Sequence, residues 1–299
     1  MITTSYLKKT IMMKIEMVST PIQVSLAVYF IFATGGYTPD VLKLFLIDAV
    51  IAAGLASIIG IVFNIRKINT IVSMYNDPSS DPFAIKKILL QYPHIQGFMV
   101  VFRWMGGGSL AFILLFMQFN LTRMNMLAFI IIPVLALLSY IPAYMVTESG
   151  LEELYAEPRI ANASLKKGDY INFTLGVRLV LLSLSVLLIP VVVFGYLLYL
   201  VNSQQLALQN IWLHIGFISF LSVCSVIISV NNMLKNIKSS VHMLLTSCTE
   251  LKNGNFTIDA IPMTNSNELG IVCQQVNELM IKLKDIIVNV KESSDLVST

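Results

Sequence analysis

The chain of 299 residues is 56% hydrophobic and 12% charged, whereas soluble domains carry roughly 25% charged residues. The charged residues gather between long uncharged stretches, a pattern typical of a membrane protein and not of a soluble core. A net charge of +3 gives no indication of a nucleic-acid partner. The cysteines, Cys224, Cys248 and Cys273, have no metal-ligand spacing, so we expect no disulfide framework, no metal and no cofactor.

Six apolar segments are long enough to cross a membrane as helices, for which about 20 residues are needed. They are Val18–Gly36, Leu44–Ile65, Gly97–Phe119, Asn125–Thr147, Phe173–Val201 and Ile211–Val230. The first can also be read as a signal peptide, because Lys8, Lys9 and Lys14 precede its apolar run. The length of this apolar run and the five apolar segments that follow favour a first transmembrane helix that is kept in the mature protein. The sequence therefore predicts an all-α membrane protein in which residues 1–230 form a six-helix transmembrane domain.

The distribution of Lys and Arg predicts the orientation of these helices, because cytoplasmic loops are enriched in both residues. With the N-terminus in the cytoplasm, all but Lys43 and Arg123 of the 20 basic residues fall on the inner side. Both termini are then cytoplasmic, and the expected location is the inner (cytoplasmic) membrane. The outer loops are too short for a folded sensor domain, so a stimulus has to be read in the membrane, at its surface or from the inner loops; these outer loops are Tyr37–Lys43, Asn120–Met124 and Asn202–Asn210.

Two inner loops share a pattern that indicates duplicated helical hairpins. The first contains Tyr75-Asn76-Asp77-Pro78 and, further on, Lys86-Lys87. The second contains Tyr155-Ala156-Glu157-Pro158 and, further on, Lys166-Lys167. One interpretation is ordinary: proline after an acid ends a helix, and the lysines anchor to anionic headgroups. The other is that both loops form a pseudo-symmetric surface that contacts the segment after the last span.

Three charged side chains inside the predicted spans are candidates for sensing or for structure, because ionisable groups in a membrane need a partner or water. Arg103 and Arg178 occupy matching positions, each five residues after a phenylalanine near the start of its span, and both can snorkel to the interface. Asp48 lies about one turn into the second span. Lys43, five residues earlier, is its favoured partner.

The most specific pattern follows the last predicted span. Apolar or small residues recur there at alternating spacings of four and three, which is typical of a coiled-coil seam. The first seam consists of Val230, Leu234, Ile237, Val241, Leu244, Cys248 and Leu251. Asn253-Gly254 then ends the helix. After an irregular connector, a second helix opens near Asn267-Glu268, and its seam consists of Leu269, Val272, Val276, Leu279, Leu283, Ile286 and Val290.

The length of the connector predicts that these two helices lie parallel, because an antiparallel hairpin would need only a few residues. Neither helix can bury its seam alone. Two copies of the pair would form a parallel four-helix bundle, so the sequence predicts a homodimer.

The segment Asn231–Asp285 resembles the HAMP linker of bacterial transmembrane receptors. The resemblance rests on Gly254-Asn255-Phe256, on Glu268-Leu269-Gly270 and on Val276-Asn277-Glu278-Leu279. It implies that Glu268 and Gly270 set the second helix. It also implies that Phe256, together with Ile261 or Met263, holds the connector against the bundle.

The chain departs from that family in two places. Ser240 stands near the position where a proline is usual, and the connector is one residue longer. The alternative is an unrelated membrane-proximal coiled coil. With the resemblance, residues 231–285 are the HAMP linker and residues 286–299, which continue the heptad pattern, resemble the start of the signalling helix of a methyl-accepting chemotaxis receptor.

These features favour a chain without enzymatic activity of its own that relays a stimulus across the membrane, similar to the sensor half of a chemotaxis receptor. The expected partners are the lipid bilayer, a second copy of the chain and a cytoplasmic signalling protein. One alternative is the regulatory half of a class III nucleotide cyclase. Another is a transporter, which would explain the hairpin repeat and Asp48 but not the coiled coil. A histidine kinase is disfavoured, because no histidine follows His242.

Overall fold

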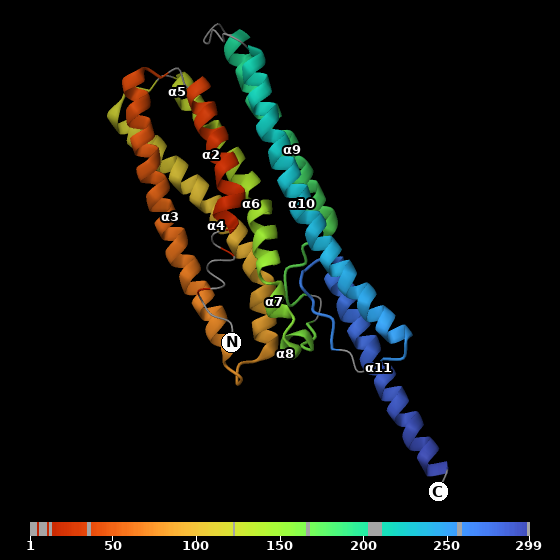
Figure 1. The fold of residues 1–299 in the computed structure, drawn as a ribbon. Coiled ribbons are helices and arrows are strands. Elements are labelled where there is room, and N and C mark those ends of the chain that lie inside the picture. The colour runs from red at the N-terminus through yellow and green to blue at the C-terminus, as the bar shows by residue number, and fades with distance from the viewer. Residues whose placement is uncertain are drawn as a thin grey trace.

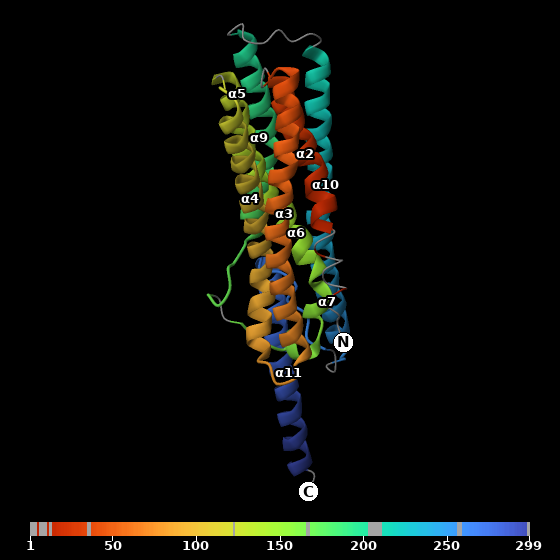
Figure 2. The same ribbon diagram turned by 90° about the vertical axis from the view of Figure 1, so that its left-hand side faces the viewer.

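The computed structural model describes residues 5, 11, 14–34, 37–121, 123–165, 168–202, 211–255 and 259–297, and they contain helices and no strand. The long helices run along a common axis and form an elongated bundle, from one end of which the last helix projects (Figures 1 and 2). These helices are α2 (Lys14–Thr34), α3 (Pro39–Asn76), α4 (Pro82–Gln118), α6 (Ile131–Gly150), α9 (Leu175–Asn202), α10 (Ile211–Lys252) and α11 (Glu268–Val297). The short helices are α5 (Arg123–Leu127), η2 (Ala128–Ile130), α7 (Glu152–Tyr155) and α8 (Pro158–Ala161).

Four helical segments are long and apolar enough to cross a membrane, namely α3, α4, Asn125–Gly150 and Trp212–Lys252. Large apolar side chains on these segments point outward; on α3, Val50 is 72% exposed and Ile59 is 60% exposed. Apolar surface of this kind is rare on soluble monomers and suits contact with lipid. The chain is therefore a multi-pass membrane protein.

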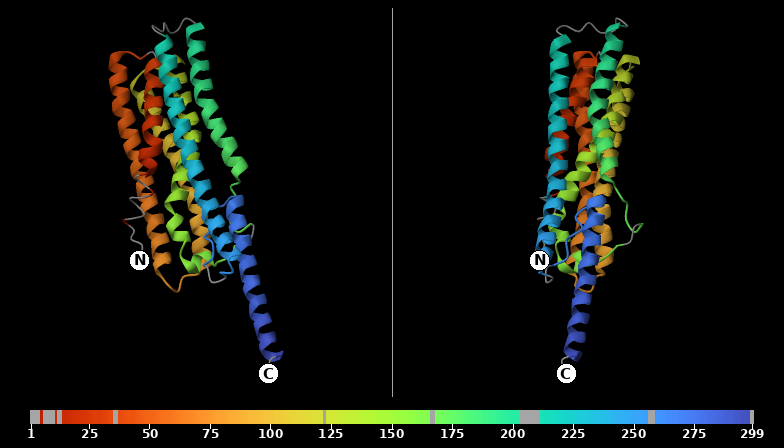
Figure 3. Two further views of the ribbon diagram at one scale, coloured as in Figure 1. Left: turned by 45° about the vertical axis from the view of Figure 1, so that its right-hand side comes forward. Right: turned by 90° about the vertical axis from the view of Figure 1, so that its right-hand side faces the viewer.

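The two other predicted spans fall on α2 and α9. The apolar stretches described in these helices are shorter, Gln23–Phe32 in α2 and Leu175–Leu184 and Pro190–Asn202 in α9. Both helices nevertheless run alongside the longer ones, with α2 packed against α6 and α9 packed against α6 and α10 (Figure 3).

The hairpin of α3 and α4 continues beyond the predicted spans. α3 ends at Asn76, directly before Asp77-Pro78, which is where the sequence places the turn. Asp81 caps α4, because its carboxylate accepts a hydrogen bond from the Phe83 N–H at 3.1 Å, and Pro82 occupies the first helical position. Pro158 begins α8 in the same way.

α10 joins the sixth predicted span to the first predicted coiled-coil helix without a break. Its 42 residues extend about 63 Å at 1.5 Å per residue. It ends at Lys252, and Gly254 follows with a φ of +79°, a backbone conformation that favours glycine after a helix. The connector spans residues 253–267, and its described part after the gap at residues 256–258 runs back along the bundle, so that α11 runs in the same direction as α10 (Figures 1 and 3). The two helices thus have the parallel course that the connector length predicts.

The connector is part of the hydrophobic core at the end of the bundle from which α11 projects, called here the α11 end. A buried cluster at this end joins α3 and α4 to the second loop, residues 151–174. Met263 of the connector belongs to the same cluster and is 1% exposed. The membrane helices and the predicted relay therefore share one core.

Candidate functional site at the junction of the bundle and the connector

A buried ion pair joins α9 to α6 at the α11 end. Arg178 Nη1 lies 2.6 Å from Glu148 Oε2, and Arg178 Nη2 donates to Glu148 Oε1 at 2.9 Å, so the pair is bidentate. The side chains are only 3% and 4% exposed. Because two charges lose much hydration when they are buried, such a pair needs good geometry and further hydrogen bonds.

Those further hydrogen bonds come from several helices. The Tyr144 hydroxyl donates to Glu148 Oε1 at 3.1 Å and accepts from Arg178 Nη2 at 3.0 Å. Arg178 Nε donates to the Phe173 carbonyl at 2.9 Å, and the guanidinium lies over the Tyr144 and Phe173 rings. Asn236 of α10 donates to Glu148 Oε2 at 3.4 Å. The ion pair therefore ties together α6, α9 and α10.

The connector contacts the same group of side chains. Ser266 Oγ lies 3.1 Å from the Tyr144 hydroxyl, and the Ser266 carbonyl accepts from the Phe173 N–H at 3.2 Å. We call Tyr144, Glu148, Arg178, Ser266 and Glu268 the junction.

Glu268 links the first residue of α11 to the first residue of α9. Its Oε2 accepts a hydrogen bond from the Leu175 N–H at 2.8 Å. The first N–H groups of a helix have no partner within it, and the positive end of the helix dipole favours an anion there. The carboxylate therefore caps α9 from a residue that lies 93 positions later in the chain.

The start of α11 fits closely against the connector. A Cβ atom on Gly270 would lie 2.1 Å from the Asn265 carbonyl oxygen, so only glycine fits here without a backbone shift. Asn267 Oδ1 accepts from the Leu269 and Gly270 N–H groups at 3.0 and 3.3 Å. Ser240, which is 1% exposed, accepts from Asn265 Nδ2 at 2.8 Å. The Ser240 hydroxyl thus ties α10 to the connector.

Asn277 holds the middle of the connector. Its Oδ1 accepts from the Ile261 N–H at 2.7 Å, and its Nδ2 donates to the Ile261 carbonyl at 2.8 Å. The side chains of Ile261 and Met263 are 2% and 1% exposed, so both are buried within the chain. Phe256, the other residue expected to hold the connector, lies outside the described residues.

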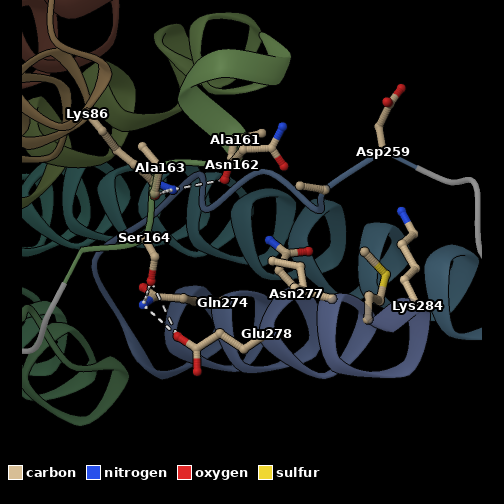
Figure 4. Close-up of a pocket in the computed structure, with 13 residues that line it drawn as sticks. Lys86, Ala161, Asn162, Ala163, Ser164, Asp259, Gln274, Asn277, Glu278 and Lys284 are labelled. Carbon is tan, nitrogen blue, oxygen red and sulfur yellow. Dashed lines mark hydrogen bonds between the residues drawn. The ribbon is translucent and has the colours of Figure 1, made fainter. Parts of the chain in front are cut away.

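The second loop also contacts α11. Gln274 of α11 donates to Ser164 Oγ at 2.7 Å and to the Leu165 carbonyl at 2.9 Å. Lys86 of α4 reaches across the second loop and donates to the Ala161 and Ala163 carbonyls at 3.2 and 2.5 Å (Figure 4). A polar cavity of about 190 Å³ lies between the second loop, the connector and α11.

The burial of Lys86 decides between two interpretations of the paired lysines. Lys86 is 2% exposed and hydrogen-bonded to backbone, so it does not anchor to headgroups, whereas Lys87 is exposed. Burial raises the pKa of Cys273 to about 11. Lys166-Lys167, the matching pair, lies outside the described residues.

The two inner loops contact one another. Arg159 of the second loop donates to the Asp77 carbonyl at 2.9 Å and to the Tyr75 carbonyl at the end of α3. Among the described residues, it is the second loop that forms the hydrogen bonds with α11 given above, so the surface is not symmetric.

The two other charged candidates lie away from the junction. Asp48 is 5% exposed and accepts from Gln118 Nε2 of α4 at 3.2 and 3.3 Å, so its partner is this amide and not Lys43. Arg103 Nη2 donates to Ser57 Oγ of α3 at 2.9 Å.

Most residues of the predicted seams face away from the bundle, but Val230 and Ile237 of α10 pack against a buried cluster of α6 and α9. Every one of these residues is exposed or half-buried; on α11, Val272 is 41% and Leu279 53% exposed. The face of α11 that packs on the bundle is a different one and contains Gly270, Cys273 and Met280. One face of α11 therefore packs against the rest of the chain, and the seam on its other face is available to pack against a second chain. The less exposed seam residues are Leu244, Leu251, Leu269, Val276 and Leu283, and the more exposed ones include Val241 and Cys248.

Comparison of the chain with protein-family models, with curated proteins and with solved structures finds no match. Among the described residues, no group of three or more His, Cys, Asp or Glu side chains converges where a metal ion could be held. The hydrogen bonds and the ion pair of the junction hold α6, α9, α10 and the start of α11 in one arrangement.

Proposed function

We propose that the chain is a transmembrane signal relay of the chemotaxis-receptor type. Six membrane helices, with both termini in the cytoplasm, pass a change in their packing through a HAMP-type pair of helices to a cytoplasmic output. The observation that carries the proposal is the hydrogen bond from the Leu175 N–H to Glu268. It makes the position of α11 depend directly on the position of α9.

The buried ion pair supplies the second element of the relay. Arg178 is on α9, and Glu148 is on α6, while Ser266 of the connector touches Tyr144 beside them. A small rotation or displacement of α9 would move Arg178 and the α9 N-terminus together. Packed interfaces change between discrete arrangements and do not deform continuously, so such a movement suits a two-state switch.

A homodimer is the proposed state of the relay. The bundle leaves most of the apolar seam residues of α10 and α11 exposed or half-buried, and fully burying one such side chain contributes about 1.5–3 kcal/mol. Two copies aligned along α10 would cover both seams in a parallel four-helix bundle.

Oxidative cross-linking tests the dimer. Cys248 is exposed and lies on the α10 seam, so it should meet its copy across a two-fold axis. In the C224S/C273S background, oxidation in native membranes should give a disulfide-linked species of twice the chain mass. The matched control moves the thiol off the seam, as H242C in a chain without other cysteines, next to Val241. Equal cross-linking at both positions would refute the proposed seam.

A fusion tests the relay. Residues 1–285 are joined to the kinase-controlling region of a chemotaxis receptor, and the basal kinase activity is measured. E268Q weakens the cap on α9 and should shift this activity, whereas E292Q, an exposed change further along α11, should not. Wild-type activity in both E268Q and S266A would contradict the proposed coupling.

A further inference from the structure

A second site lies inside the membrane part of the bundle, remote from the junction. A cavity of about 280 Å³ opens between α2, α3, α4 and the segment that leads into α6. Its walls are almost entirely apolar. Small residues from the facing helices create the space, among them Ala53 and Ala56 on α3 and Gly107 and Ala111 on α4. A Cβ atom on Gly107 would already come within 3.5 Å of the Ala56 Cβ atom.

Among the described residues that line this cavity, Arg103 is the one that carries a charge. Its guanidinium donates to Ser57 Oγ at 2.9 Å, and Ser57 also lines the cavity. Gly60 leaves room for this arrangement, because a Cβ atom there would lie 2.6 Å from Arg103 Cδ. The Arg103 side chain therefore lies against α3, and its guanidinium is at the wall of the apolar cavity.

The cation is at the end of the cavity nearest the α11 end. The α4 residues of the lining extend from Val100 to Ala111, about 16 Å along the helix, and Arg103 lies close to the first of them. Arg103 is six residues into the predicted span Gly97–Phe119, about 9 Å from its inner end, within the reach of a snorkelling side chain. A ligand with one acidic end and one apolar body would match this distribution of charge.

The volume sets the size of that ligand. Cavities of about 150 Å³ hold a benzene molecule, and pockets for small ligands start at about 300 Å³. A space of about 280 Å³ thus suits a single hydrocarbon chain and is too small for the two chains of a phospholipid. A guanidinium binds a carboxylate in bidentate geometry. In a fatty acid, that carboxylate is attached to a single hydrocarbon chain.

We propose that this cavity binds a medium-chain fatty acid, with the carboxylate on Arg103 and Ser57 and the chain between the small residues of α3 and α4. Binding of a fatty acid would name the class of stimulus for the proposed relay. The binding itself does not depend on the proposed function; only the effect of the ligand on the cytoplasmic output does. An occupied cavity would separate α3 from α2, and α4 carries both Arg103 and Lys86, so the binding site and the second loop share one helix.

Tryptophan fluorescence tests the binding directly. The chain has two tryptophans, Trp104 in the cavity lining and Trp212, which is 80% exposed on α10. The W212F variant in nanodiscs of zwitterionic phosphatidylcholine reports on Trp104 alone. A dodecanoic acid with two bromines in its chain should quench this fluorescence saturably. R103Q should weaken the binding about tenfold or more, because a charge-assisted hydrogen bond is lost.

Two size variants separate the cavity from the lipid surface. A53L places a large side chain in the lining and should abolish saturable quenching. G54L adds the same side chain one residue away, where nothing lies within 4 Å of the Cβ position, and should leave it unchanged. Circular dichroism and gel filtration confirm that each variant is folded before it is compared.

Two further probes identify the chemistry. The methyl ester of the brominated acid keeps the chain without the charge, and brominated phosphatidylglycerol keeps an anionic headgroup on two chains. Weak quenching by both supports a fatty-acid site. The proposal would be overturned if the ester quenched as strongly as the acid, or if quenching by the acid were unaffected by R103Q and A53L. Stronger quenching by the phospholipid than by the acid would overturn the assignment of a single-chain ligand. Because binding is read at Trp104, this result stands or falls separately from the relay experiment with E268Q.

Discussion

The buried pair of Glu148 and Arg178 offers the sharpest quantitative test of the junction. E148Q removes the counterion of a guanidinium whose residue is 2% exposed. Breaking a buried pair from one side costs about 3–5 kcal/mol, because the remaining charge is left without compensation. R178Q leaves the Glu148 carboxylate in the same position and should cost a similar amount. The double variant E148Q/R178Q leaves no charge, so it should cost about as much as one single change and not the sum of two.

The quantity to compare is the coupling energy of the double-mutant cycle, which we expect to be at least about 2 kcal/mol. The free energy of unfolding is measured in mixed micelles at one fixed protein concentration, since association would otherwise change it. Glu157 and Arg159 provide the matched control, because their side chains are 26% and 25% exposed. Partly exposed pairs contribute about 0–1 kcal/mol. Additive costs at Glu148 and Arg178, with a coupling below about 0.5 kcal/mol, would refute the reasoning.

Three further outcomes follow from the contacts of α11. G270A should destabilise the chain by about 1–3 kcal/mol, because the added Cβ atom meets a backbone oxygen. G216A is the control and should not destabilise it, because nothing lies within 4 Å of that Cβ position. Thermal unfolding compares the two variants. N277A removes both hydrogen bonds to the connector backbone and should raise hydrogen exchange in residues 259–263, with no change in the membrane helices. A maleimide at pH 7.5 should label Cys248 and spare Cys273, because Cys273 is buried and its raised pKa leaves little thiolate; labelling of Cys273 should increase as the pH approaches 11.

Local patterns in the sequence predicted the long helices, the ends of α3 and α10 and the course of α11. The break at Asp77-Pro78, the glycine after α10 and the long connector each act over a few residues, so a single chain shows them. Of the six predicted spans, four fall on helices long and apolar enough to cross a membrane, and the apolar stretches described in α2 and α9 are shorter. The HAMP-type bundle stays a prediction, because its seams would be covered only by a second chain.

The junction itself could be predicted only in part. Arg178 was a candidate because a cation inside an apolar segment needs a partner. Glu148 was not, because it directly follows the predicted end of the fourth span and resembles an ordinary loop acid. The two residues are 30 positions apart, and Asp48 and Gln118 are 70 apart, so no periodicity connects them. The side chain of Lys86 shows the same limit, since only the fold brings the second loop over it.

The cap that Glu268 places on α9 has a consequence for how the protein is made. At about 5–20 residues per second, a ribosome reaches Glu268 about 5–20 s after Leu175, which lies 93 residues earlier. During that interval the first N–H group of α9 lacks its carboxylate, and Tyr144 lacks Ser266. The helix α9 is thus made with an unfinished end, and only synthesis of α11 supplies the carboxylate that completes it.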